Sequence, residues 1–89
     1  MNIVYREAKI FLKHLKKLPT PMQLQVRNAI ADFQENPNQP HLRNHQLKGK
    51  MKGTWSISAG GDMRIHYQKF KNGDILILFI DVGTHSQLY

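Results

Sequence analysis

The spacing of apolar residues predicts two consecutive helices in the first part of the chain. Apolar side chains recur at three- and four-residue steps over two segments, the pattern of helices with one buried face. The first segment ends at Pro19 and carries Ala8, Phe11, Leu12, Leu15 and Leu18. In the second, Thr20 is the predicted N-terminal cap, Pro21 takes the first helical position and Asn36-Pro37 ends the helix. Its apolar stripe consists of Met22, Val26, Ala29, Ile30 and Phe33.

Alternating or continuous apolar runs predict four strands around this helical hairpin, over residues 3–5, 55–58, 63–70 and 75–82. The last is nearly all apolar, which is typical of a strand in the middle of its sheet. Asn72-Gly73 before it indicates a two-residue hairpin turn, since both residues tolerate positive φ. Proline and glycine interrupt residues 37–54, which predicts a loop with a short extended piece near Leu47.

The order of these elements predicts a single α+β domain over residues 1–89. The order is β-α-α-β-β-β, a small antiparallel sheet with the two-helix hairpin packed on one face. In the strand over 63–70, alternation places Met63, Ile65 and Tyr67 on one side and Arg64, His66 and Gln68 on the other. Residues 83–89 are predicted to form a short polar tail.

The charge of the chain indicates a polyanionic partner. Thirteen Lys and Arg stand against six Asp and Glu, for a net charge of +7. Residues 36–61 contain no acidic residue, and the first predicted helix adds four lysines. A solvated, lysine-rich surface is the simpler interpretation, but glycines between the loop lysines would let a phosphate backbone approach closely. The predicted RNA-binding residues are Arg43, Lys48, Lys50, Lys52 and His66.

Other classes are excluded or disfavoured by composition. The chain has no cysteine, which excludes disulfide scaffolds and thiolate metal sites. No apolar run reaches the roughly 18–20 residues of a membrane span, and no hydrophobic signal region is present, so we expect no membrane partner and a cytoplasmic location. His41 and His45 have a spacing that binds metal on a helix, but Pro40 predicts a loop there. We therefore expect neither a metal nor a cofactor.

Several of the remaining side chains have the chemistry that RNA cleavage requires. Attack by the RNA's own 2′-hydroxyl needs a base, an acid and cations that stabilise the crowded phosphorane. Histidine can serve as base or acid near neutral pH, and Arg64 can hold two phosphate oxygens at once. Tyr89 can stack on an unpaired base or transfer a proton. His66 is either a surface contact or a site residue, whereas His14 is predicted on a helix surface and Asp81 at a strand end.

Three motifs together carry a family resemblance: His45-Gln46-Leu47-Lys48-Gly49, Gly61-Asp62-Met63-Arg64-Ile65-His66-Tyr67 and Gly83-Thr84-His85-Ser86-Gln87-Leu88-Tyr89. With them, the chain resembles the RelE/ParE superfamily, the toxins of bacterial type II toxin–antitoxin systems, and is closest to its YafQ-like branch. The resemblance extends over essentially the whole chain, including the helical hairpin.

The resemblance implies an activity and a set of site residues. Toxins of this branch are ribosome-dependent endoribonucleases that cut mRNA in the ribosomal A site. By position, His45 and His85 would be the acid–base histidines, Asp62 the functional aspartate, Arg64 the phosphate-stabilising arginine and Tyr89 the terminal aromatic. Lys48, Lys50 and Lys52 would contact ribosomal RNA or mRNA. A cognate antitoxin with an acidic or amphipathic segment is the implied protein partner.

One departure from the family pattern leaves alternatives open. Ser58 stands where YafQ-like toxins often carry a further histidine on the strand before the Gly-Asp turn. A non-enzymatic inhibitor of DNA gyrase, as on the ParE side of the superfamily, is the first alternative. A catalytically decayed RNA-binding module is the second.

Overall fold

A computed structural model describes residues 2–89, with three α-helices, five strands and two short 3₁₀ turns in that range. The elements in chain order are β1 (Ile3–Glu7), α1 (Lys9–Lys17), α2 (Thr20–Glu35), η1 (Pro40–Leu42), β2 (His45–Gln46), η2 (Gly49–Met51), β3 (Trp55–Ser58), β4 (Met63–Asn72), β5 (Asp74–Thr84) and α3 (His85–Leu88). The predicted helices and strands are thus present, and no helix in the described range is long and apolar enough to cross a bilayer.

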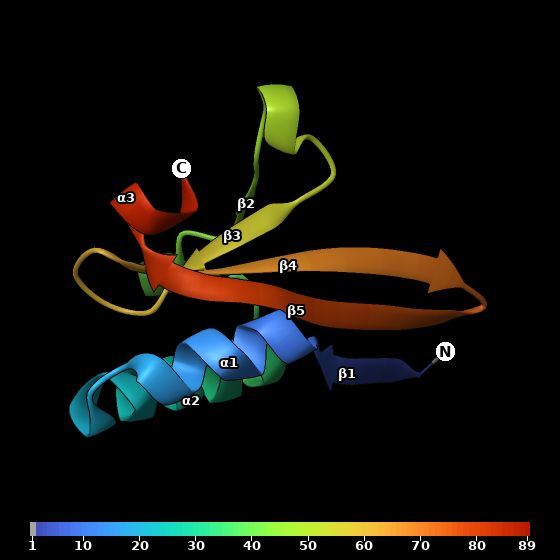
Figure 1. Cartoon of the computed structure of the whole chain (residues 1–89). Helices are drawn as coiled ribbons and strands as arrows, with labels where there is room; N and C mark the ends of the chain where they lie inside the picture. Colours follow the sequence, from blue (N-terminus) through green and yellow to red (C-terminus); the bar gives the residue numbers. More distant parts are fainter. Residues whose placement is uncertain (1) are drawn as a thin grey trace.

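The five strands form one sheet in the order β1-β5-β4-β3-β2 (Figure 1). Strand β5 lies inside the sheet, as its apolar sequence predicts. Strand β1 runs parallel to β5, with Ile3 opposite Ile75 and Glu7 opposite Phe79, so the sheet is mixed and not wholly antiparallel. Parallel neighbouring strands need a long connection. Here the chain passes through every element from α1 to β4 on its way from β1 to β5.

Helices α1 and α2 cover one face of the sheet and enclose the core (Figure 1). The centre of the core is aromatic: the ring centroids of Phe33 and Tyr67 lie 4.9 Å apart, and Phe79 packs edge-on against both. These rings hold the middle of β4 and β5 rigidly against α2. Arg64 and His66 of β4 lie on the opposite face, next to the C-terminal turn that carries Tyr89.

The start of α2 differs from the predicted cap. Pro19 is the N-cap and Thr20 already belongs to the helix, with no side-chain hydrogen bond at this end. Met22, predicted in the apolar stripe, is 37% exposed, because it lies in the first turn of α2 beside the helical connection. The other four residues of that stripe are buried as predicted.

Strand β4 keeps the predicted alternation, with Met63, Ile65 and Tyr67 in the core, but it contains an irregularity. A β-bulge shifts the register between His66 and Tyr67, which lie opposite Asp81 and Phe79. His66 and Tyr67 are both buried although they are neighbours in sequence. Tyr67 enters the helix-covered core, and His66 is covered by the C-terminal turn. At the far end of the hairpin only Gly73 has positive φ, since Asn72 remains paired in the strand opposite Asp74.

The predicted polar tail is a single helical turn, α3. The Gln87 backbone N–H donates to Thr84 Oγ1 at 3.3 Å, and the Thr84 N–H donates to Gln87 Oε1 at 2.8 Å. This reciprocal pair is a capping box, and the spacing of Thr84 and Gln87 in the sequence is its signal. The capping box fixes the direction in which the chain leaves β5.

Candidate active site

A cavity of about 280 Å³ lies beside β2, β3, β4 and the C-terminal turn, and none of its lining residues comes from α1 or α2. Residues from the loop before β2, from β2 to β4 and from α3 surround it: Arg43, His45, Leu47, Ser58, Arg64, His85 and Tyr89. The structure therefore brings together His45, Arg64, His85 and Tyr89, which the sequence predicts as site residues, and adds Arg43 from the predicted RNA-binding set. Two histidines and two arginines therefore line one small space.

The imidazole of His45 is fixed by a backbone carbonyl. Its Nδ1 lies 2.7 Å from the carbonyl oxygen of Arg43, which can only accept, so Nδ1 carries the proton. In the neutral ring the lone pair is then on Nε2. Arg43 has left-handed backbone angles, φ 48° and ψ 43°, which are costly for a residue with a side chain. The strained residue thus supplies the group that selects the tautomer of His45.

The guanidinium of Arg64 is oriented by the turn before β4. Its Nη1 donates to the carbonyl oxygens of Gly61 at 2.8 Å and Met63 at 2.9 Å, and to Ser58 Oγ at 3.3 Å. Ser58 Oγ also accepts the Gly60 N–H at 3.2 Å. Ser58, the departure from the YafQ-like pattern, therefore positions Arg64. All three bonds use Nη1, so the Nη2–Nε edge takes no part in them.

His85 and Tyr89 stack at the mouth of the cavity. Their ring centroids lie 4.2 Å apart with an interplanar angle of 26°. The Tyr89 hydroxyl donates to Ser56 Oγ at 3.2 Å and lies 3.0 Å from His66 Nε2. The hydroxyl therefore points into the sheet, while the side chain as a whole is 48% exposed. This geometry presents the ring, and not the hydroxyl, to a ligand.

The predicted RNA contact of His66 is wrong. Its side chain is only 2% exposed and lies beneath Tyr89, outside the residues that line the cavity. Burial lowers the pKa of His66 below its usual value of 6.5; Asp81 opposes this shift and His45 and His85 reinforce it. Alternation in the sequence could not show this, because the residues that cover His66 come from the C-terminal turn.

Asp62 and the loop lysines lie outside the cavity. Asp62 is exposed and contributes its backbone carbonyl, which accepts the N–H of His85 at 3.1 Å. Lys48, Lys50 and Lys52 are exposed on and beside η2, which projects away from the sheet (Figure 1). Helix α1, which carries Lys9, Lys13, Lys16 and Lys17, lies on the other side of β4 and β5 from this turn (Figure 1).

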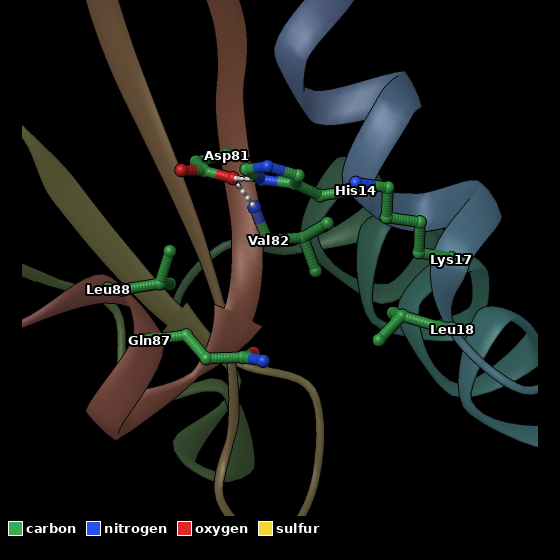
Figure 2. Close-up of a pocket in the computed structure, with 7 residues that line it drawn as sticks. All are labelled: His14, Lys17, Leu18, Asp81, Val82, Gln87 and Leu88. Carbon is green, nitrogen blue, oxygen red and sulfur yellow. Dashed lines mark hydrogen bonds and ion pairs between the residues drawn. The ribbon is translucent and has the colours of Figure 1, made fainter.

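A second cavity, of about 390 Å³, lies between α1, β5 and α3 and contains no predicted catalytic residue (Figure 2). At one end of it, His14 Nδ1 and Asp81 Oδ1 are 2.6 Å apart, and the Val82 N–H donates to the same oxygen at 2.8 Å. His14 is therefore not a free surface residue, and Asp81 lies inside β5 and not at its end. Together they join α1 to the sheet. Within residues 2–89, no group of three or more His, Asp or Glu side chains could hold a metal ion.

Comparison with known proteins identifies the family. Residues 5–89 match the model of the ParE toxin of the type II toxin–antitoxin system parDE. The chain belongs to this toxin family. The RelE/ParE resemblance of the sequence is thus confirmed, and the partner class of the family is an antitoxin. No curated protein matches this ParE-family toxin.

Solved structures share the fold of this ParE-family toxin at low sequence identity. YafQ from E. coli strain BL21(DE3) is 20% identical with a TM-score of 0.76, covering 99% of this chain and 97% of that one. The archaeal RelE–RelB complex from Pyrococcus horikoshii OT3 contains a chain 17% identical with a TM-score of 0.72, covering 98% and 99%. A YoeB/ParE toxin from Agrobacterium tumefaciens is 19% identical with a TM-score of 0.71, covering 96% and 99%. These similarities confirm the predicted α+β fold.

Proposed function

We propose that this toxin is an endoribonuclease that cleaves mRNA on the ribosome, using the 2′-hydroxyl of the RNA as the nucleophile. The observation that supports this is the convergence of His45, His85 and Arg64 on one cavity. A protein that acted only by binding would not need an acid–base pair beside a phosphate-binding arginine. The reaction takes place in the cytoplasm, where the ribosomes are.

The fixed tautomer of His45 suits the role of general base. Its Nε2 lone pair takes the proton of the 2′-hydroxyl as the 2′-oxygen forms a bond to phosphorus. The bond from phosphorus to the 5′-oxygen breaks, and protonated His85 gives its proton to that oxygen. The products are a 2′,3′-cyclic phosphate and a free 5′-hydroxyl. Arg64 stabilises the extra negative charge of the phosphorane through its Nη2–Nε edge.

The remaining predicted residues bind and position the substrate. The exposed ring of Tyr89 can stack on an unpaired base next to the scissile phosphate. Arg43, Lys48, Lys50 and Lys52 attract the phosphate backbone of mRNA or ribosomal RNA. Asp62 acts through its backbone, because its carbonyl holds the N–H of His85.

Inhibition of DNA gyrase is the second candidate function, and the family match itself favours it, since the matching family is that of ParE. In that case the cavity performs no chemistry and the basic surface binds the target. A catalytically decayed RNA-binding module would bind RNA and leave both mRNA and gyrase unaffected.

A cleavage assay on programmed ribosomes separates these functions. We expect new mRNA ends with wild-type protein and a loss of about 100-fold or more in His45→Ala and His85→Ala. Both side chains are exposed, so the variants should stay folded, and Lys71→Ala at the distal hairpin is the matched control. Undiminished cutting by both histidine variants would refute the mechanism. Inhibition of gyrase supercoiling without cleavage would establish the second candidate.

We also propose that the cognate antitoxin covers the basic surface with an acidic or amphipathic segment. Opposite charge would give rapid and partly salt-sensitive association. Co-expression with the adjacent small reading frame should restore the growth that the toxin arrests. Failure of every adjacent frame to restore growth would contradict the pairing.

A further inference from the structure

His66 is a titratable side chain that the cleavage mechanism does not use. It lies on β4 beneath the cavity, is 2% exposed and has Tyr89 as its side-chain hydrogen-bond partner in the described chain. The Tyr89 hydroxyl donates to Ser56 Oγ, so His66 Nε2 carries a proton and donates to the Tyr89 oxygen at 3.0 Å. The rings of His66 and Tyr89 also meet edge to face, with centroids 5.0 Å apart.

Tyr89 in turn supports the ring of His85. The two rings stack at 4.2 Å, and the Tyr89 N–H donates to the carbonyl oxygen of His85 at 3.0 Å. Helix α3, which joins them, has only four residues, and so short a helix has little stability of its own. Its first turn is held by the capping box between Thr84 and Gln87. Its far end is attached to the sheet through the Tyr89 hydroxyl.

A neutral ring at position 66 suits this location. The charged and titratable groups that act on it are Asp81 from β5, His45 from β2 and His85 from α3. A cation on His66 would oppose protonation of His45 and His85, the two groups that must carry protons in the reaction. A neutral hydrogen-bond donor supports Tyr89 without adding that repulsion.

We propose that His66 is a positioning residue of the nuclease: through the Tyr89 hydroxyl, it holds the C-terminal turn and thereby the His85 imidazole at the cavity. This inference rests on the proposed function for its effect on catalysis. Its structural part, the coupling of residue 66 to the ring of His85, is independent of the activity.

The test compares His66→Phe with His66→Gln. Phenylalanine keeps the bulk and the aromatic edge but has no donor, whereas the glutamine amide can restore a donor near the position of Nε2. We expect His66→Phe to lower kcat by about 10- to 100-fold with a smaller change in KM, because the acid is misplaced while the RNA-binding residues remain. His66→Gln should recover most of the rate.

The structural readout is the NMR spectrum of the His85 ring, which the stacked Tyr89 ring shifts. The His85 resonances should move toward those of an unstructured histidine in His66→Phe and in Tyr89→Phe, and stay near wild type in His66→Gln. His41, which pairs with Asp32 elsewhere, is the internal control. The double variant His66→Phe/Tyr89→Phe should shift the His85 resonances no further than either single variant does. Both substitutions remove the same hydrogen bond between residues 66 and 89.

Two results would overturn the proposal: unchanged His85 resonances in folded His66→Phe, or additive effects in the double variant. If His66→Phe does not fold, Tyr89→Phe carries the test, since it leaves the buried strand intact. A wild-type protein that cuts no mRNA would refute the proposed function, whereas the His85 resonances would still decide whether residue 66 positions the turn.

Discussion

The hydroxyl of Tyr67 donates a 2.7 Å hydrogen bond to Oδ1 of Asn44, the residue between Arg43 and His45. Tyr67 is 1% exposed and packs on Phe33 and Phe79, so this bond ties the loop before β2 to the centre of the core. The position of His45 at the cavity therefore depends on a residue on the other face of the sheet.

Removal of this hydroxyl should weaken both stability and catalysis. In Tyr67→Phe the part-buried Oδ1 of Asn44 loses its donor, which we expect to cost about 1–2 kcal/mol of unfolding free energy. The loop that carries His45 also loosens, so cleavage should fall while RNA affinity changes less. Urea unfolding and single-turnover cleavage measure the two effects. Wild-type stability in this variant would show that the bond does not hold the loop.

The same tyrosine should make the protein sensitive to alkali. Burial raises the pKa of Tyr67 to about 12 from 10.0, so the folded state keeps the proton that the unfolded chain loses first. The stabilisation from protonated Tyr67 is complete below pH 10 and is lost as pH rises toward 12. The loss lowers the unfolding free energy by up to about 2–3 kcal/mol. Unfolding free energies across this range should fall more steeply for wild type than for Tyr67→Phe. Parallel curves would contradict the raised pKa.

Much of the fold follows from sequence periodicity, and the failures have physical causes. The helix stripes and the apolar run of β5 are visible because burial acts along a whole element. The burial of His66 is not predictable from alternation, because Tyr89, which covers it, follows a four-residue turn that has no periodicity. The parallel pairing of β1 depends on contacts between opposite ends of the chain.

The pairing of His45 with His85 is predictable only through the family motifs. His45 and His85 lie far apart in sequence, and no spacing rule brings them together. Three hydrogen bonds support these histidines: Tyr89 bonds Ser56 and His66, and Tyr67 bonds Asn44. The sequence gives no sign of them, because each bond joins residues from separate elements. One signal was available: the spacing of Thr84 and Gln87, which marks the capping box.

Arg43→Gly should separate stability from RNA binding. Glycine relieves the strain of the left-handed backbone at position 43, which stabilises the fold by about 1–2 kcal/mol. Its greater entropy in the unfolded chain costs about 0.5–1 kcal/mol. The variant should therefore be slightly more stable than wild type. The carbonyl that holds His45 remains, but one cation is lost from the cavity. Thermal unfolding and RNA titration measure the two effects. Arg43→Lys, which keeps the strain and the charge, should match wild type, and a destabilised Arg43→Gly would contradict the strain.

Acid should weaken the fold through His66. Because burial lowers its pKa below 6.5, the unfolded chain takes up the proton first as pH falls. The stabilising contribution of neutral His66 is complete above pH 6.5 and is lost progressively below it. Unfolding free energies measured between pH 7.5 and 5 should decline more for wild type than for His66→Gln, which does not titrate. Equal declines would assign the acid sensitivity to other groups.

The two groups of lysines should differ in their contribution to RNA binding. The η2 turn lies on the same side of β4 and β5 as α3, and helix α1 lies on the opposite side (Figure 1). With a 2′-O-methyl RNA that cannot be cut, Lys48→Ala/Lys50→Ala/Lys52→Ala should lower the slope of log affinity against log salt by about 2, or about 0.7 per phosphate contact. The matched triple variant Lys9→Ala/Lys13→Ala/Lys16→Ala removes the same charge from α1 and should leave the slope near wild type. Equal losses in both variants would mean that net charge, and not its placement beside the cavity, attracts the RNA.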